Sequence, residues 1–512
     1  MKSAYKISVL LSLFIFLMVG CTKDFETINK DPNKASEVPT YAFLTNAQKQ
    51  LNDNMFDAWW GGRQSMLWSQ SWAQNNYTDE DRYNIRQNIN NTYWRTLYTV
   101  MSDLNEIIRL NTDEATKAGM SAYGSNANQI ASARILRAWT FQHLTDLYGD
   151  IPYFDALKAD QGSDFYLPKY DKQADVYPAI IMELTEAAAQ IDGGAGWTQG
   201  DVIYGGDMSK WKKFANSIKL RMAMRMMKVD NAKATQFANE AIAAGVFESN
   251  ADNAVFKYLG AAPNTAPMYT AYYIDARTDF AVTGQFVDLL KGIPVGGAQK
   301  TNPFAGIADP RLPIFADPVQ DGTLLGEGIQ GMPYGMEDGT TKLIGAQGSS
   351  WPGAAILAPD FGCIMMSYSE VAFILSELNG WNQAKYIDGV TASLEYWGVA
   401  QADIDAYIAA LPAANMETVL TQKYIAFYTQ GYEAWSEYRR TGYPKTLVHP
   451  NEVTWVNSAG EEIKFIPLQG DAIPRRLTYP QEEQTVNGTN YDAAVAVFGQ
   501  DDFATRMWWD KQ

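Results

Sequence analysis

Histidine and cysteine are almost missing from this chain, which excludes several kinds of catalytic centre. Among 512 residues only His143, His449, Cys21 and Cys363 occur. A zinc site of three or four His and Cys ligands is not readily assembled from this set. A Ser-His-Asp triad would need one of the two histidines, and no Gly-x-Ser-x-Gly elbow is present to support it. We therefore predict no catalytic residues, no metal site and no cofactor.

Two of these four residues have structural interpretations. Cys363 stands beside Ile364 and Met365, which favours a small buried apolar residue over a nucleophile. His143 lies inside an apolar helical pattern and is most simply a hydrogen-bonded structural histidine.

Positive charge is also in deficit. The chain has 41 Lys and Arg against 58 Asp and Glu, a net charge of −17 at pH 7. Affinity for nucleic acid comes largely from basic side chains that neutralise phosphates, so we exclude nucleic-acid binding.

Long apolar runs are confined to the start of the chain. The run Ile7–Gly20 follows Lys2 and Lys6 and ends at Cys21. It is too short to span a bilayer, which takes roughly 20 apolar residues, and its basic start is typical of a secretory leader. Leu17–Cys21 resembles a bacterial lipobox, in which the cysteine is lipidated and becomes the first mature residue.

The leader sets the predicted domain organisation. We predict a lipoprotein signal peptide over residues 1–20, lipidation of Cys21 by acyl chains such as palmitate, and a polar tether over 21–40. Acyl chains contribute about 0.8 kcal/mol per buried methylene, so two or three would anchor the protein durably. The alternative is an ordinary cleaved leader with a chance cysteine. Residues 41–512 would form a single globular domain.

Aromatic residues are abundant, with 15 Trp, 29 Tyr and 22 Phe. Much of this must be core, because large rings bury area efficiently. Sugar rings present flat C–H faces that stack on Trp and Tyr, so a secreted, acidic, Trp-rich protein is also a candidate glycan binder.

Aromatic residues in predicted loops are the candidate ligand contacts. Trp68, Trp72 and Tyr77 lie among Gly, Ser, Gln and Asn, where they either cap the core of a helical domain or form a binding platform. A Gly- and Pro-rich stretch over about 260–361 is read as a loop-rich insertion that carries a binding surface. The full candidate set, chosen on aromatic or donor chemistry alone, is Trp68, Trp72, Tyr77, Tyr269, Tyr272, Arg277, Tyr334 and Trp351.

Helical periodicity dominates the rest of the chain. We predict helices over Ala42–Phe56, Trp94–Leu110, Ile130–Leu147, Val176–Ile191, Ser209–Lys228, Ala232–Ala244, Tyr368–Leu378, Ala384–Trp397 and Thr418–Arg440. The helix that begins at Ser209 has Asp207 or Ser209 as its N-cap. Helical pairs recur over Trp211–Gly245 and Tyr368–Gly398, and pairs of about 34 residues are typical of tetratricopeptide-type repeats. The predicted fold is therefore mainly α, with tetratricopeptide-like helix pairs as scaffold.

Several ordered segments carry a family resemblance. The chain resembles the SusD/RagB family over Gly205–Met208 with Trp211 and Lys213–Arg225, Ser367–Phe373, Gln422–Phe427, Glu433–Trp435 with Tyr438–Pro444, and Ile473–Leu477. These segments are mostly scaffold: Glu370, Glu433, Arg439 and Arg440 are interpreted as buried ion-pair or capping residues.

The resemblance implies a lipoprotein of the bacterial outer membrane that faces the cell exterior. It also implies four tetratricopeptide-like helix pairs and a SusC-like TonB-dependent transporter as partner, to which oligosaccharides, or in some relatives peptides, are delivered. Two alternatives stay open from the residues alone. A surface glycoside hydrolase needs only two carboxylates about 5 to 9.5 Å apart, and a protein–protein scaffold needs only the helix pairs.

Overall fold

All but one of the predicted helices correspond to single helices in the computed structural model, which describes residues 38–512. The predicted leader, Cys21 and almost all of the tether lie outside the described residues. The long helices are α3 (Thr40–Met55), α4 (Gln87–Thr112), α6 (Asn126–Tyr148), α7 (Gln173–Gln190), α8 (Met208–Met226), α9 (Asn231–Ala244), α14 (Tyr368–Leu378), α15 (Gln383–Tyr396), α16 (Gln401–Ala410), α17 (Met416–Ala426) and α18 (Gly431–Thr441). The prediction of a mainly α fold is confirmed.

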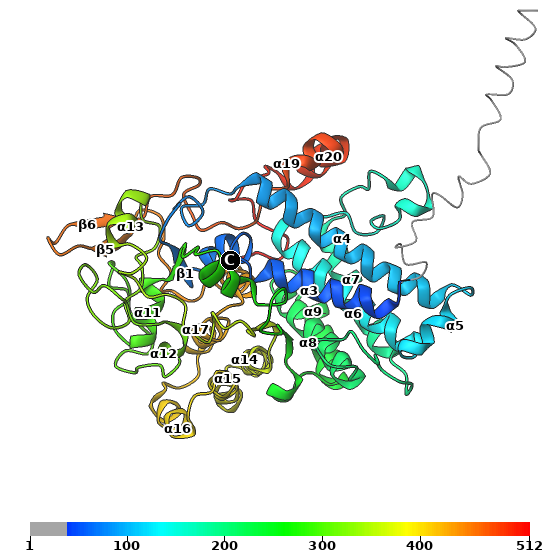
Figure 1. Cartoon of the computed structure of the whole chain (residues 1–512), viewed down its shortest axis with the longest axis horizontal. Coiled ribbons are helices and arrows are strands. Elements are labelled where there is room, and N and C mark those ends of the chain that lie inside the picture. Colours follow the sequence, from blue (N-terminus) through cyan, green and yellow to red (C-terminus); the bar gives the residue numbers. More distant parts are fainter. Residues whose placement is uncertain (1–37) are drawn as a thin grey trace, which may run out of the picture. The chain divides into compact units, whose positions relative to one another are not determined.

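Consecutive helices pack on one another as pairs. Helix α3 packs on α4, α6 on α7, α8 on α9, and α14 on α15, while α4 also lies along α6 and α7 along α8 (Figure 1). Most of these interfaces belong to a large hydrophobic core, in which Trp211, Phe214, Ile218 and Met222 of α8 are fully buried. A second, smaller cluster lies between α14, α15, α16 and α17. Among the two predicted caps it is Asp207 that caps α8, because its carboxylate accepts hydrogen bonds from the backbone N–H of Ser209 and Lys210.

Buried ion pairs join the helices across this core. The Arg221 guanidinium of α8 donates to both carboxylate oxygens of Glu370 in α14, at 2.7 and 2.6 Å, and lies 3.1 Å from Glu433 in α18. Arg440 pairs with Glu377 at 2.6 Å. Arg439 lies 3.7 Å from the centre of the Trp435 ring and donates to backbone carbonyl groups. The scaffold interpretation of these residues is therefore confirmed.

The predicted single helix Thr418–Arg440 is wrong, because the structure divides it into α17 and α18. Thr429, in the turn between the two helices, has a left-handed backbone with φ of 74°, which is incompatible with a continuous right-handed helix. At Gly431, a Cβ atom would stand 2.4 Å from the backbone of Ser65. The break therefore lets another segment of the chain lie directly against the start of α18.

The segment around Ser65 belongs to the irregular part of the fold. This irregular part contains two π-helices, η1 (Gly61–Met66) and η6 (Thr270–Ile274), and the short helices α10 (Pro267–Tyr269), α11 (Gly284–Lys291), α12 (Leu312–Phe315) and α13 (Asp338–Ile344). Antiparallel strand pairs are β1 (Trp72–Gln74) with β3 (Phe280–Val282), β2 (Ala254–Lys257) with β4 (Gly362–Met366), and β5 (Val453–Val456) with β6 (Glu462–Lys464). Figure 1 shows α11, α12, α13, β5 and β6 grouped away from α4–α7.

The β1–β3 pair connects the start of the chain to the predicted insertion. Gln74 pairs with Phe280 and Trp72 with Val282. Because the strands are antiparallel, the loop that follows β1 and the loop that precedes β3 emerge at the same end. Two segments separated by some 200 residues thus meet here, and they form the site described below.

The remaining elements are α5 (Lys117–Met120) and, near the end of the chain, α19 (Gln481–Val486) and α20 (Gly488–Phe498). Residues 40–512 form one compact unit. Within the described part of the chain, no helix has the length and apolarity that crossing a membrane would require.

Candidate functional site

The site begins with two neighbouring tryptophans that face opposite ways. Trp60 is buried, donates its indole N–H to the Tyr432 hydroxyl, and stacks on Tyr93 with ring centres 3.8 Å apart. Trp59 is 40% exposed. A surface indole held beside a fully buried one has little freedom to collapse inward, so its ring stays available to a ligand.

The turn that holds Trp59 is built on Asp57. The Asp57 carboxylate accepts hydrogen bonds from the backbone N–H groups of Trp59, Trp60 and Gly61, at 3.2, 2.6 and 3.0 Å. Burial raises the pKa of Asp57 to about 7, although these three hydrogen bonds act to lower it. The carboxyl group is thus committed to the backbone of the turn.

Two arginines lie against the Trp59 ring. The guanidinium carbon of Arg277 is 4.6 Å from the ring centre and that of Arg63 is 5.3 Å away, both within the range of a cation–π contact. Arg63 belongs to η1 and is buried, whereas Arg277 follows η6 and is about one-third exposed. The Trp59 indole therefore contacts two guanidinium groups, one buried and one partly exposed.

Buried carboxylates fix both arginines. Asp279 accepts from Arg63 at 2.7 Å and from Arg277 at 2.9 Å. Glu80 accepts from Arg63 at 3.3 Å and from the Gln74 amide at 2.6 Å. Burial lowers the pKa of Arg63, and the charges of Glu80 and Asp279 oppose that change. The ion pair with the buried Asp279 therefore holds the Arg277 side chain in place beside Trp59.

Both π-helices border this network. In η1, a Cβ atom on Gly62 would stand 2.8 Å from the Phe280 ring, so only glycine lets β3 approach. In η6, Tyr273 is 50% exposed and its ring centre lies 5.3 Å from that of Tyr269. π-Helices occur frequently at functional sites. We call Trp59, Tyr269, Tyr273 and Arg277 the aromatic–arginine surface.

The structure separates the predicted contact residues into two groups. Trp68, Trp72, Tyr272 and Tyr334 are core residues with at most 4% exposure, so the prediction that they present rings to a ligand does not match their position. Their polar atoms are mostly used internally: the Trp72 indole donates to the Tyr428 hydroxyl and the Tyr272 hydroxyl to the Phe280 carbonyl. These rings are buried because large aromatic side chains remove much apolar area from water when they fill the core.

The second group is accessible. Tyr77 is 55% exposed, with φ of 58°, in the loop that follows β1, and its backbone N–H donates to Asp338. Tyr269 and Arg277 belong to the aromatic–arginine surface. Trp351 is half-buried and packs edge-on against Tyr272 with ring centres 5.5 Å apart, next to the same segment.

Trp59, Tyr273, Arg63 and Asp279 were not among the residues chosen from the sequence. One signal could have indicated Trp59: a tryptophan pair directly before Gly61-Gly62 sits at a sharp change of direction, where one of the two rings must face outward. Nothing local distinguishes Arg63 or Asp279, which come together only through β1–β3 pairing.

The chemistry of this arrangement is recognition by stacking and hydrogen bonding. Among the residues that the structure describes, Asp279 is the sole hydrogen-bond acceptor for the Arg277 side chain, which leaves further guanidinium N–H groups for a ligand. Across residues 38–512 no cluster of His, Cys, Asp and Glu could hold a metal ion. His143 and Cys363 are buried outside this surface, and burial lowers the pKa of His143 to about 3.

Comparisons with known proteins identify the family. A family model described as "Starch-binding associating with outer membrane" matches residues 32–480. No curated protein matches the chain.

Several solved structures are similar over nearly the whole chain. A chitin-binding protein is 28% identical with a TM-score of 0.72 and covers 91% of this chain and 100% of its own. A chitin-binding SusD homologue from Flavobacterium johnsoniae is 24% identical with a TM-score of 0.71, covering 92% and 98%. A SusD homologue from Parabacteroides distasonis is 24% identical with a TM-score of 0.74, covering 92% and 98%. Since the family model spans most of its length, this chain belongs to the SusD-like family.

Proposed function

We propose that this protein is a non-enzymatic cell-surface lipoprotein that captures oligosaccharides on its aromatic–arginine surface. The observation that carries the proposal is the exposed Trp59 indole with Arg277 fixed beside it by a buried ion-pair network. An indole or phenol face stacks on the C–H face of a sugar ring, and a guanidinium donates to sugar hydroxyl groups.

The comparisons support a polysaccharide fragment as ligand. The family is described as starch-binding, and two similar structures are of proteins named chitin-binding. Both kinds of polymer present repeated rings, which suits a surface with several separate aromatic side chains. A peptide is the alternative ligand, since guanidinium N–H groups also bind backbone carbonyl groups and carboxylates.

We further propose that acyl chains on Cys21 anchor the protein to the outer membrane, facing outward, and that a SusC-like TonB-dependent transporter receives the ligand. Protease added to intact cells should then degrade the protein without breakage of the outer membrane. Mild detergent should extract it together with a much larger barrel protein. Protection of the protein from protease in intact cells would contradict the outward orientation. Extraction as a lone monomer would contradict the proposed transporter partner.

Isothermal calorimetry tests the ligand class. The leaderless protein, beginning at Thr22, is titrated with starch fragments, chitin oligosaccharides and a peptide digest. Saturable heat with an oligosaccharide is expected. Saturation by peptides alone would contradict oligosaccharide capture and support a peptide ligand. Steady heat flow that never saturates would mean turnover and favour a hydrolase.

A further inference from the structure

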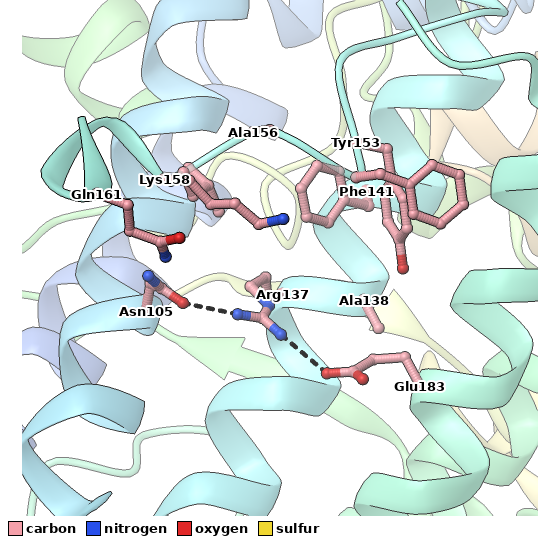
Figure 2. Close-up of a pocket in the computed structure, with 11 residues that line it drawn as sticks. Asn105, Arg137, Ala138, Phe141, Tyr153, Ala156, Lys158, Gln161 and Glu183 are labelled. Carbon is pink, nitrogen blue, oxygen red and sulfur yellow. Dashed lines mark hydrogen bonds and ion pairs between the residues drawn. The ribbon is translucent and has the colours of Figure 1, made fainter. Parts of the chain in front are cut away.

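A separate pocket lies on the helical scaffold, formed by elements other than those of the aromatic–arginine surface. Its floor comes from α4, α6 and α7, and its rim from the loop between α6 and α7 (Figure 2). The volume is about 270 Å³. Small-molecule sites in proteins usually measure about 300–1,000 Å³, so this pocket suits a single ring-sized molecule.

The floor of the pocket is rigid. Arg137 donates to the Asn105 side-chain carbonyl at 2.8 Å and to Glu183 at 2.9 Å (Figure 2). Glu183 also accepts two hydrogen bonds from Arg134, at 2.9 and 2.7 Å. Burial raises the pKa of Glu183, but the two arginines more than offset this and lower it overall. Since two guanidinium groups share this carboxylate, the floor offers little negative charge.

The rim supplies a cation that lacks a close partner. The Lys158 ammonium projects into the pocket in Figure 2, and its ion pair with Asp155 is long, at 3.7 Å. Among the described residues, Asp155 is its sole ion-pair partner, and the ammonium lies 5.6 Å from the centre of the Phe165 ring. The Asn105 and Gln161 amides face the same space and add N–H donors.

Aromatic side chains line the other side. Phe154 is 44% exposed at the rim, and Tyr153 packs edge-on against Phe141 with ring centres 4.7 Å apart. Burial raises the pKa of Tyr153 to about 12, so its hydroxyl stays a donor at neutral pH. Leu157, next to Lys158, has φ of 60°, a strained conformation that a leucine rarely adopts.

Lys158 and the Asn105 and Gln161 amides supply hydrogen-bond donors, and Tyr153 and Phe154 supply an aromatic wall, so the pocket suits a ligand with a negative charge and a flat body. We propose that it binds a small carboxylate carried on a single ring, with Lys158 as the ion-pair partner and Tyr153 and Phe154 as the walls. Either a sugar acid or an aromatic acid has this chemistry. The proposal does not depend on oligosaccharide capture at the aromatic–arginine surface.

The test titrates the chain from Thr22 with D-glucuronate, 3-phenylpropanoate and, as the neutral control, D-glucose. Calorimetry should show saturable binding of at least one carboxylate, weakened by 1 M salt, and none of D-glucose. Saturation by glucuronate alone supports a sugar acid, and saturation by phenylpropanoate alone supports an aromatic acid. Neither carboxylate binding at up to about 10 mM would overturn the proposal, as would D-glucose binding equally well.

Variants assign the binding to the pocket. Lys158→Met should weaken carboxylate binding by about tenfold or more, because an ionic hydrogen bond is lost. Lys158→Arg should retain most of it. Lys169→Met removes the same charge from an exposed lysine of the same loop, 4.0 Å from Asp155, and should change nothing. Equal losses in the Lys158→Met and Lys169→Met proteins would overturn the proposal, and Trp59→Ala should leave this binding intact.

Discussion

Trp59 and Trp60 show how single residues divide between stability and recognition. The two are adjacent and chemically identical, yet Trp60 is 2% exposed and Trp59 is 40% exposed. The Asp57 carboxylate determines this difference, since it fixes the backbone N–H groups of both residues and so the direction of each side chain.

Asp81 gives a prediction at the same scale. It is fully buried on the loop after β1, and burial raises its pKa to about 8 from an ordinary 3.8. A raised pKa means that the native state holds the proton more tightly than the unfolded chain. The resulting stability is full below the unfolded pKa and is lost as pH rises through about 8.

Urea unfolding from pH 4 to 8 should therefore show a steeper loss of stability for the natural protein than for Asp81→Asn, which mimics the protonated side chain at every pH. The difference is expected to reach several kcal/mol, since each pKa unit is worth about 1.4 kcal/mol. Asp79→Asn, an exposed change in the same loop, is the matched control. Identical slopes for the natural protein and Asp81→Asn would contradict the raised pKa.

At the scale of elements, ion pairs between helices should matter more where both side chains are buried than where the carboxylate is exposed. Glu370→Gln removes the carboxylate that accepts two hydrogen bonds from the buried Arg221. Leaving a buried charge poorly paired should lower the free energy of unfolding by about 3–5 kcal/mol. Glu240→Gln breaks the Lys219 pair, in which the glutamate is exposed, and should cost about 1 kcal/mol or less. Similar values from chemical denaturation would refute this ranking.

The π-helix η1 should be sensitive to one methyl group. Gly62→Ala would place a Cβ atom 2.8 Å from the Phe280 ring and 2.9 Å from Met268. We expect a loss of about 1–3 kcal/mol in stability from overpacking, together with weaker oligosaccharide binding as β3 shifts. Gly119→Ala in α5, where a Cβ atom meets nothing within 4 Å, is the control and should be near neutral. A Gly62→Ala protein as stable as Gly119→Ala would contradict the packing.

Elements with helical periodicity could be predicted from the sequence, because a repeating apolar stripe depends only on local spacing. The range Tyr368–Leu378 is the clearest case, since prediction and structure agree. The break after α17 could not be predicted, because it depends on Ser65 approaching Gly431 from a distant part of the chain. The same limit applies to Trp68 and Trp72, whose polar neighbours suggest loops. Trp72 is buried in β1 where it pairs with β3, and the Trp68 ring is buried against Trp435 of α18.

At the scale of the whole molecule, the site exists because distant segments converge. Arg63 and Arg277 are separated by more than 200 residues, and the carboxylate of Asp279 joins them. The sequence predicts Arg277, Tyr77, Tyr269 and Trp351 as candidate contacts, and all four lie at or near the surface. The contact of Arg277 with the Trp59 ring depends on tertiary structure and could not be predicted. Whether they bind ligand stays a prediction.

The most direct test of oligosaccharide capture compares three proteins by calorimetry with the tightest-binding oligosaccharide of the panel. Trp59→Ala should weaken binding by about tenfold or more, as expected when one aromatic stacking partner is lost. Tyr166→Ala, which removes a ring that is 64% exposed in the loop between α6 and α7, should bind like the natural protein. Unfolding measurements should show both variants folded. Unchanged affinity in a folded Trp59→Ala protein would contradict the account and place the binding site elsewhere.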